Sequence, residues 1–142
     1  MPVRLEAGTL NTHGIAGLLA GVRYLMEEER WKSFQEKELR LAELFYRELK
    51  DCPEFIFYGD PAGELRAPVI SLNLKEEDSG EVSDWLFHEY GICTRPGGHC
   101  APLMHEFFHT ERQGMVRFSF SHGNTEEEVC RAAAALREMT EQ

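Results

Sequence analysis

Several features that define other classes of protein are missing from this chain of 142 residues. No apolar run approaches the roughly 20 residues that a membrane-spanning helix needs. No apolar block leads to a small-residue cleavage site near the start, so we expect no signal peptide and a cytoplasmic location. Basic residues are few, and 15 Lys and Arg against 25 Asp and Glu give a net charge of -10. Such a surface repels nucleic acid and anionic membranes, and we expect neither as a partner.

The cysteines show neither the spacing of a disulfide framework nor a C-x-x-C pair, so we expect no structural metal site. Cys52 lies at a helix end, Cys93 in an apolar strand and Cys130 in a helix. We expect these three to be small packing residues. Cys100 stands apart because of its neighbours.

Apolar periodicity predicts four helices. Their ranges are 15–26, 31–50, 78–91 and 124–139, and polar residues 27–30 either bend or separate the first two. Asp78 or Ser79 is expected to cap the third helix, and Thr125 with Glu128 forms a capping box for the fourth.

Segments rich in β-branched and aromatic residues predict four strands. Their ranges are 54–59, 68–74, 92–95 and 115–121. This order of elements predicts an α+β domain, with a small antiparallel or mixed sheet covered by helices.

The segment "RPGGHCAP", residues 95–102, places a thiol on a loop. Pro96, Gly97 and Gly98 prevent regular structure, and loops lie at the surface. Arg95 and His99 can bring positive charge to the sulfur of Cys100, which favours the nucleophilic thiolate. The alternative is a cysteine packed under a turn.

Arg117 lies in the middle of the apolar strand "MVRFSFS". A buried arginine needs an anionic partner, and a guanidinium holds a carboxylate through two parallel hydrogen bonds. A substrate carboxylate is one such partner. A structural salt bridge, or a strand face open to water, explains the residue equally well.

A second motif, "HEFFH" at residues 105–109, matches the H-E-x-x-H pattern of zinc hydrolases. In that interpretation His105 and His109 bind zinc and Glu106 is the general base. Pro102 and Gly114 leave room only for a short helix, and no third ligand follows at the usual spacing. A polar helix with solvated histidines is therefore the favoured interpretation.

Three stretches, taken together, resemble the class V aminotransferase family. They are "RLEAGTLNTHGIAGLLAGVRYL", "RPGGHCAPLMH" and "GMVRFSFSHGNTEEEV". Within that family they look like the cysteine desulfurase and selenocysteine lyase branch, whose members are homodimers that use pyridoxal phosphate (PLP). The resemblance implies the fold of the C-terminal small domain of a fold-type I PLP enzyme.

The resemblance also implies roles for individual residues. Cys100 would take sulfur from L-cysteine as a persulfide and pass it to an acceptor protein, leaving alanine. Arg117 and Arg95 would bind the substrate, and His99 is a candidate for proton transfer. Thr9, with Gly8, would reach the phosphate of the partner subunit's PLP.

Members of this family are much longer, and their large domain carries the lysine that binds PLP. Only Lys32, Lys37, Lys50 and Lys75 occur here, all in charged helical or turn contexts outside that lysine motif. We therefore expect a C-terminal fragment, inactive and without cofactor by itself. Residues 1–30 would be the end of the large domain and a linking helix, and residues 31–142 the small domain.

Two departures from the family's pattern leave the substrate open. "HCAPL" is one residue tighter than in many desulfurases, and His122 and Gly123 stand where relatives often have aromatic residues. A transaminase or a selenocysteine lyase is the alternative within the family. Outside it stand the zinc hydrolase, a sulfur-carrying module that works without PLP, and a non-catalytic dimerisation domain.

Overall fold

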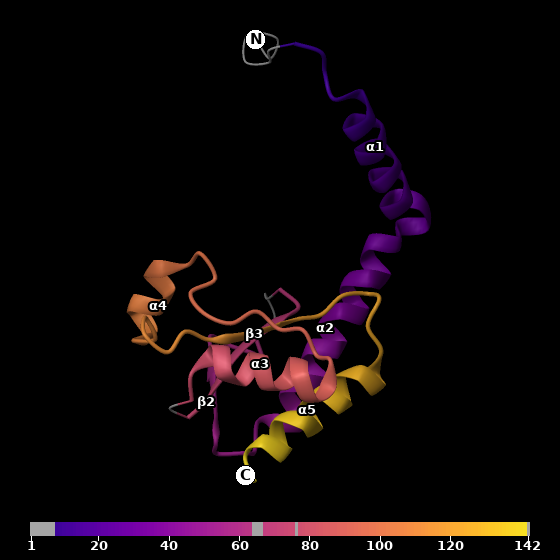
Figure 1. Cartoon of the computed structure of the whole chain (residues 1–142). Coiled ribbons are helices and arrows are strands. Elements are labelled where there is room, and N and C mark those ends of the chain that lie inside the picture. Colours follow the sequence, from indigo (N-terminus) through magenta and orange to yellow (C-terminus); the bar gives the residue numbers. More distant parts are fainter. Residues whose placement is uncertain (1–7, 64–66, 76, 142) are drawn as a thin grey trace. The chain divides into compact units, whose positions relative to one another are not determined.

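The computed structural model describes residues 8–63, 67–75 and 77–141. The chain divides into two compact units, Met1–Phe34 and Gln35–Gln142, and each is described by itself. Figure 1 shows the order of the elements along the chain.

The first unit contains two separate helical segments. Helix α1 (Thr12–Met26) begins where the Asn11 side chain accepts a hydrogen bond from the backbone N–H of Gly14, at 2.9 Å. A short 3₁₀ turn, η2 (Glu27–Glu29), follows, and its Glu28 has a left-handed φ of 52°. Helix α2 (Arg30–Leu49) starts directly afterwards and continues into the second unit. The polar segment therefore separates two helices rather than bending one.

The apolar stripe predicted for α1 is present but uncovered. None of the helix's residues is buried, and Leu18 is 70% exposed. Amphipathic patterning of this kind normally faces a packed partner.

The second unit is built on a three-stranded antiparallel sheet. Its strands are β1 (Phe55–Tyr58), β2 (Val69–Leu74) and β3 (Val116–Ser119), in the order β1-β2-β3. Ile70 lies opposite Phe118, and Leu72 opposite Val116. The sequence patterns predicted these strands to within one or two residues at each end.

The strand expected at 92–95 was wrong. Helix α3 (Ser79–Tyr90) ends at Gly91, whose φ is 66°, and the backbone N–H of Ile92 donates back to the carbonyl of Leu86, at 3.1 Å. The N–H of Ile92 is therefore used in the cap of α3 and not in strand pairing. Only Arg95 pairs, through an isolated bridge to Arg117.

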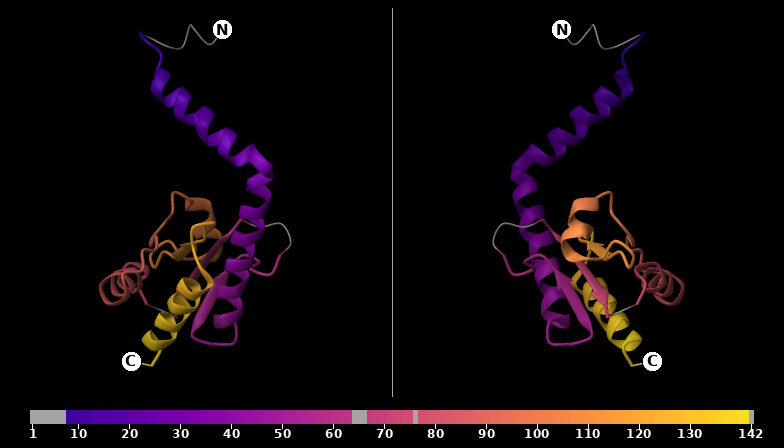
Figure 2. Two further views of the ribbon diagram at one scale, coloured as in Figure 1. Left: turned by 90° about the vertical axis from the view of Figure 1, so that its right-hand side faces the viewer. Right: turned by 90° about the vertical axis from the view of Figure 1, so that its left-hand side faces the viewer.

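One face of the sheet carries the hydrophobic core. Alternate strand residues point to it, including Phe55, Ile70, Leu72, Val116 and Phe118. Helices α2, α3 and α5 (Glu126–Met139) cover this face with the buried residues Leu41, Phe45, Leu49, Val82, Leu86, Val129, Ala133 and Leu136. Helix α5 lies between α2 and α3 (Figure 2), and Arg137 donates to the carbonyl of Glu48 on α2, at 2.7 Å.

The other face of the sheet carries polar groups. Tyr58, Ser71 and Arg117 follow one another across it from strand to strand. Asn73, 1% exposed, donates to the hydroxyl of Tyr58 and to the carbonyl of Gly114, at 3.1 and 2.8 Å. The short helix α4 (Pro102–Phe108) approaches this side, where the ring of Phe108 contacts that of Tyr58 at 5.3 Å.

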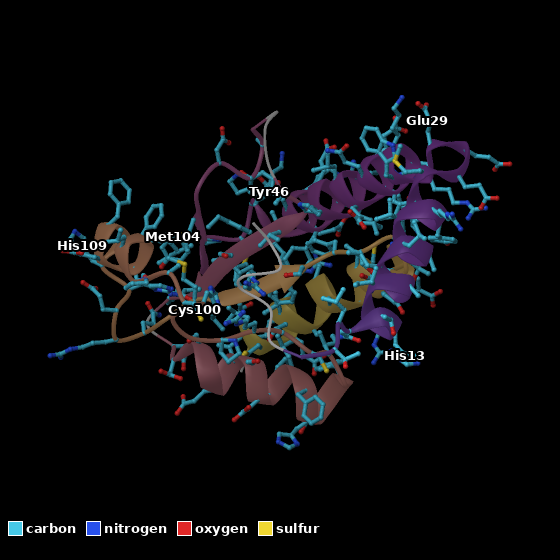
Figure 3. All side chains as sticks on the ribbon, turned by 90° about the horizontal axis from the view of Figure 1, so that it is seen from above. His13, Glu29, Tyr46, Cys100, Met104 and His109 are labelled. Atoms are coloured by element: carbon cyan, nitrogen blue, oxygen red, sulfur yellow. The ribbon has the colours of Figure 1, made fainter. Side chains whose placement is uncertain are left out.

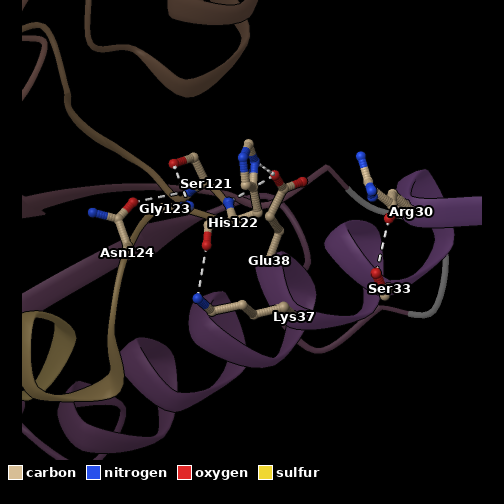
Figure 4. Close-up of polar contacts among 8 residues, drawn as sticks. All are labelled: Arg30, Ser33, Lys37, Glu38, Ser121, His122, Gly123 and Asn124. Atoms are coloured by element: carbon tan, nitrogen blue, oxygen red, sulfur yellow. Dashed lines mark hydrogen bonds and ion pairs between the residues drawn. The ribbon is translucent and has the colours of Figure 1, made fainter. Parts of the chain in front are cut away.

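The connection between β3 and α5 is tied to α2. Lys37 donates to the carbonyl of His122 at 2.7 Å, and Glu38 accepts from the backbone N–H of the same residue at 2.9 Å (Figure 4). The side chain of Asn124 closes the turn by accepting from the N–H of Ser121, at 3.0 Å. The "SHGN" sequence therefore forms an anchored turn.

Two of the three cysteines expected to pack do not. Cys93 and Cys130 are exposed, whereas Cys52 is half-buried against the core. Cys130 follows the buried Val129 by one helical step of about 100°, which turns it to the solvent face of α5.

Candidate active site

The loop that carries Cys100 is fixed at its start to the sheet. Arg95 and Arg117 exchange both backbone hydrogen bonds, with the Arg95 N–H donating at 3.1 Å and the Arg117 N–H at 2.9 Å. Two residues later the N–H of Gly97 donates to the Ser79 hydroxyl at 3.1 Å, and its carbonyl accepts from Met115 at 3.3 Å. These bonds hold the start of the loop against β3 and fix the direction in which the loop continues.

Two glycines meet where the loop leaves the sheet. Gly114 has a φ of 69°, and a Cβ placed on it would lie 2.7 Å from the Cα of Gly97 and 2.5 Å from the Ser79 hydroxyl. Neither that backbone conformation nor that contact suits a residue with a side chain. Glycine at position 114 is what allows this close approach.

Cys100 lies at the exposed end of the loop, as the sequence predicted. Figure 3 shows it beside α4. His99 and Cys100 both have left-handed backbones, with φ of 52° and 58°. Such conformations are unfavourable for residues with a Cβ and mark a constrained turn. The Arg95 guanidinium approaches the thiol, with Nη2 3.5 Å from Sγ.

His99 holds the loop from inside. Its Nε2 lies 2.7 Å from the carbonyl oxygen of Arg95. A carbonyl can only accept, so Nε2 carries the hydrogen in this contact. Burial lowers the pKa of His99, and the nearby Arg117, His105 and Arg95 lower it further, against the opposing effect of the Arg95 carbonyl. The lowered pKa favours the neutral form of the ring.

Arg117 reaches the same region from β3. Its backbone is paired with Arg95, and its side chain is half-buried on the polar face of the sheet. The Nε atom is buried and has no hydrogen-bond partner within the described part of the chain. A buried guanidinium hydrogen without an acceptor is costly, so Nε is open to an acceptor.

The zinc interpretation of "HEFFH" is wrong. His105 is 3% exposed, and its Nδ1 bonds to the hydroxyl of Thr110 at 2.8 Å. His109 ends α4 with a left-handed φ of 57°, which breaks the helical i, i+4 register, and it lies at the outer end of α4, away from Cys100 (Figure 3). Within residues 8–63, 67–75 and 77–141, no three His, Cys, Asp or Glu side chains gather closely enough to hold a metal ion.

Thr110 is a site residue that the sequence did not single out, and His105 was considered only as a zinc ligand or a solvated histidine. The ring of His105 meets that of His99 edge to face, with centroids 5.7 Å apart. The available signal was a histidine within the apolar helix "PLMHEFF", one turn from a proline that fixes the helix start.

The two residues expected to bind phosphate lie in the first unit. Gly8 and Thr9 are exposed, directly before α1, and Gly8 has a φ of 83°. The first turn of α1 contains no acidic residue. The Thr9 hydroxyl and the N-terminal end of α1, where no acidic side chain lies, suit a phosphate, so these residues fit the group.

Comparisons with known proteins show the family to which the chain belongs. The family model for class V aminotransferases matches residues 1–131. The chain therefore belongs to the class V aminotransferase family. A probable cysteine desulfurase from Methanothermobacter thermautotrophicus is 32% identical over 139 residues, which are 97% of this chain and 34% of the relative. A cysteine desulfurase from Klebsiella pneumoniae (strain 342) is 39% identical over 136 residues, 95% of this chain and 32% of the relative.

Solved structures give the same result for the fold. The apo cysteine desulfurase of Thermococcus onnurineus NA1 superposes with a TM-score of 0.86 at 31% identity, over 97% of this chain and 33% of that one. The Escherichia coli cysteine desulfurase CsdA superposes with a TM-score of 0.83 at 26% identity, over 99% of this chain and 33% of that one. The expected fold class is confirmed. The chain spans about a third of the length of these relatives.

No helix in the described part of the chain is both long enough and apolar enough to cross a membrane.

Proposed function

We propose that this chain supplies the sulfur-accepting and substrate-binding side of a PLP-dependent cysteine desulfurase. In that reaction L-cysteine loses its sulfur to Cys100 and becomes alanine. One observation carries the proposal. The exposed Cys100 thiol lies 3.5 Å from the Arg95 guanidinium, on a loop whose first residue is paired with Arg117.

Arg117 is proposed to bind the substrate carboxylate. Its buried Nε lacks an acceptor in the described structure, and a carboxylate is the anion that a guanidinium binds through two hydrogen bonds. Arg117 lies on β3, and the Cys100 loop is attached to β3 through the backbone bridge between Arg95 and Arg117. The proposed substrate-binding residue and the loop are therefore held by the same strand. We propose that this geometry holds the substrate sulfur close to the Cys100 thiol.

Sulfur transfer needs only a thiolate from this chain. The Cys100 thiolate attacks the substrate sulfur, an S–S bond forms, and the bond between that sulfur and the substrate Cβ breaks. The bonding electrons stay on the carbon fragment, which takes up a proton and is released as alanine. When bound, PLP supplies the electron sink that makes this cleavage possible.

Cys100 then carries a persulfide, which an acceptor protein would remove. Exposure of the loop suits a thiol that must meet the substrate and then a second protein. The proton-transfer role considered for His99 is less well supported, since its Nε2 is engaged with the Arg95 carbonyl and its Nδ1 is buried. We propose instead that His99 holds the loop.

The PLP lysine is proposed to come from polypeptide beyond these residues. Three of the four lysines are engaged: Lys32 with Glu29 at 2.7 Å, Lys75 with Glu54 at 3.1 Å, and Lys37 with the turn at His122. Residues 1–30 would then belong to the large domain and residues 31–142 to the small domain, as the resemblance implies. By the same resemblance, Gly8 and Thr9 would reach the PLP phosphate of the partner subunit in a homodimer.

A chimaera tests this proposal directly. The corresponding third of the Klebsiella pneumoniae relative is replaced by this chain, and alanine and persulfide are measured with L-cysteine as substrate. We expect alanine formation, with the mass of one added sulfur atom on the Cys100 peptide. The Cys100→Ser chimaera should bind PLP but lose persulfide formation.

Each alternative predicts a different result in the same chimaera. A transaminase would transfer the amino group of cysteine to a keto acid and leave the sulfur on the carbon skeleton. A selenocysteine lyase would act on selenocysteine and leave L-cysteine unchanged. Persulfide that persists in Cys100→Ser would contradict the proposed role of Cys100.

A further inference from the structure

Two imidazole rings beneath the Cys100 loop each have one uncommitted nitrogen. His99 and His105 meet edge to face, with ring centroids 5.7 Å apart and planes at 65°. Each ring uses one nitrogen: His99 Nε2 at the Arg95 carbonyl and His105 Nδ1 at the Thr110 hydroxyl. His99 Nδ1 and His105 Nε2 are buried, and neither has a partner among the described residues.

The hydrogen positions on the two rings follow from their known partners. The Arg95 carbonyl can only accept, so neutral His99 has its hydrogen on Nε2 and a lone pair on Nδ1. The Thr110 hydroxyl is free to donate, because a hydroxyl rotates to suit its partner. If it donates to Nδ1 of His105, the hydrogen of that ring is on Nε2. His105 Nε2 is then a donor and His99 Nδ1 an acceptor, at the two unpaired atoms of neighbouring rings.

We propose that Thr110, His105 and His99 form one hydrogen-bonded chain that ends at the Arg95 carbonyl, and that His105 is a positioning residue for Cys100. The new link is Nε2–H of His105 donating to Nδ1 of His99. It requires the two rings, whose centroids lie 5.7 Å apart, to turn these two atoms toward one another. The inference concerns the same loop as the proposed function. It can be tested without desulfurase activity, because it concerns only the contacts that hold Cys100 in position.

The backbone supplies the reason such support is needed. His99 and Cys100 adopt two successive left-handed conformations, which residues with a Cβ avoid. A conformation of this kind persists only when its surroundings fix it. The His99 ring bonds back to Arg95, the residue that also approaches the thiol. A buried histidine behind that ring would keep all three in place.

One competitor for the same acceptor is present. Arg117 Nε is also a buried donor without a described partner, and its charge influences His99. If Arg117 filled Nδ1 of His99, His105 would have no role in positioning the loop. The experiment must separate these two donors.

Nitrogen-15 NMR of the histidine rings in the unmodified chain gives the first test. We expect His99 and His105 both as neutral rings with hydrogen on Nε2, and the His105 Nε2 hydrogen shifted downfield by its hydrogen bond. A hydrogen on Nδ1 in either ring would overturn the proposal. This measurement uses the unmodified chain, so a variant that fails to fold cannot affect its result.

Variants then identify the donor. Thr110→Val removes the hydroxyl at nearly constant shape, and Thr110→Ser is its matched control. We expect Thr110→Val and His105→Phe to shift the His99 ring signals, and Thr110→Ser to leave them close to those of the unmodified chain. A His99 that responds to Arg117→Lys but not to His105→Phe would refute the chain.

The consequence for Cys100 is measured by alkylation. Peptide mass spectrometry follows the reaction of Cys100 with iodoacetamide, with the exposed Cys130 as internal reference. We expect Thr110→Val and His105→Phe to slow Cys100 relative to Cys130 by about threefold or more, because Arg95 is no longer held beside the sulfur. Val129→Ala, a destabilising change on α5, should leave the ratio unchanged. An unchanged ratio in both site variants would overturn the positioning role, even if desulfuration itself were demonstrated.

Discussion

Arg95 and Arg117 face each other across a single antiparallel bridge, with backbone hydrogen bonds of 3.1 and 2.9 Å. Two guanidinium groups of the same charge therefore leave the chain at neighbouring points. Placing like charges together is unfavourable unless an anion joins them. The sulfur of Cys100 near one arginine, and a substrate carboxylate at the other, would balance the pair.

Substitution of Arg117 should act on substrate binding. Lysine keeps the charge but loses the planar pair of donors, so we expect Arg117→Lys to raise the KM for L-cysteine about tenfold or more. The measurement is steady-state alanine formation in the chimaera described above. Arg112→Lys, at an exposed arginine, is the matched control and should leave the KM unchanged. Equal effects of the two variants would remove Arg117 from the substrate site.

Gly114→Ala should disturb the loop through its base. The added methyl would lie 2.7 Å from Gly97 Cα at a backbone φ of 69°, so we expect a loss of about 1–3 kcal/mol of unfolding free energy. Urea denaturation measures this loss, and Cys100 alkylation reports the change in the loop. Gly17→Ala is the control, because a Cβ there meets no atom within 4 Å and a helix favours alanine. Wild-type stability in Gly114→Ala would show that the close approach is not needed.

The four thiols should differ in reactivity in a defined order. Burial raises the pKa of Cys52, and the neighbouring Glu54 carboxylate, 3.2 Å from its sulfur, adds to the effect. A raised pKa means less thiolate at a given pH, so we expect Cys52 to react slowest with iodoacetamide near pH 8, behind the exposed Cys93, Cys100 and Cys130.

Glu54→Gln tests the cause of that order. Removing the negative charge should speed alkylation of Cys52 while leaving Cys130 unchanged. Peptide-resolved mass spectrometry over a series of times gives both rates in one sample. If Cys52 were alkylated as fast as the exposed thiols in the unmodified chain, burial would not protect it as proposed.

The capping box of α5 should give a pH-dependent contribution to stability. The Thr125 backbone N–H, and next the Asn124 side chain, lower the pKa of Glu128 by bonding to its carboxylate. The stabilisation is therefore complete above the ordinary glutamate pKa, about 4.3, and is lost as the pH falls through the lower folded-state value.

Glu128→Gln is the matching variant. We expect it to be less stable than the unmodified chain at pH 7, with the difference shrinking as the pH falls below about 4. Urea denaturation at a series of pH values measures the difference. Glu127→Gln, an exposed neighbour on the same turn, is the control. A difference that stayed constant down to the lowest pH would rule out the carboxylate as its source.

Local sequence rules predicted most of the secondary structure. The Asp78 cap and the Thr125–Glu128 box are both present where expected. Each depends on contacts within about four residues, which a sequence shows directly. Alternate residues of β2, namely Ile70, Leu72 and Leu74, share one buried face, at 2, 0 and 5% exposure.

The failures had local as well as distant causes. Residues 92–95 have strand-like composition, but a local helix cap takes the N–H of Ile92, and of these four residues only Arg95 pairs with a strand. Cys93 and Cys130 were expected to pack, but both are exposed. His105 looked like a solvated or metal-binding histidine, and instead it is buried against His99 and Thr110.

The sequence by itself determined the helices and their caps, the strands, the exposed loop at Cys100 and the family resemblance, because these depend on local patterns. Only the tertiary structure decided which groups meet at the loop. Arg117 pairs with Arg95, which lies more than twenty residues earlier in the chain. Gly114 and Gly97 are also distant in the chain and lie in close contact. Close approaches of this kind are set by the register of the sheet and the packing on its two faces, and no spacing along the chain specifies them.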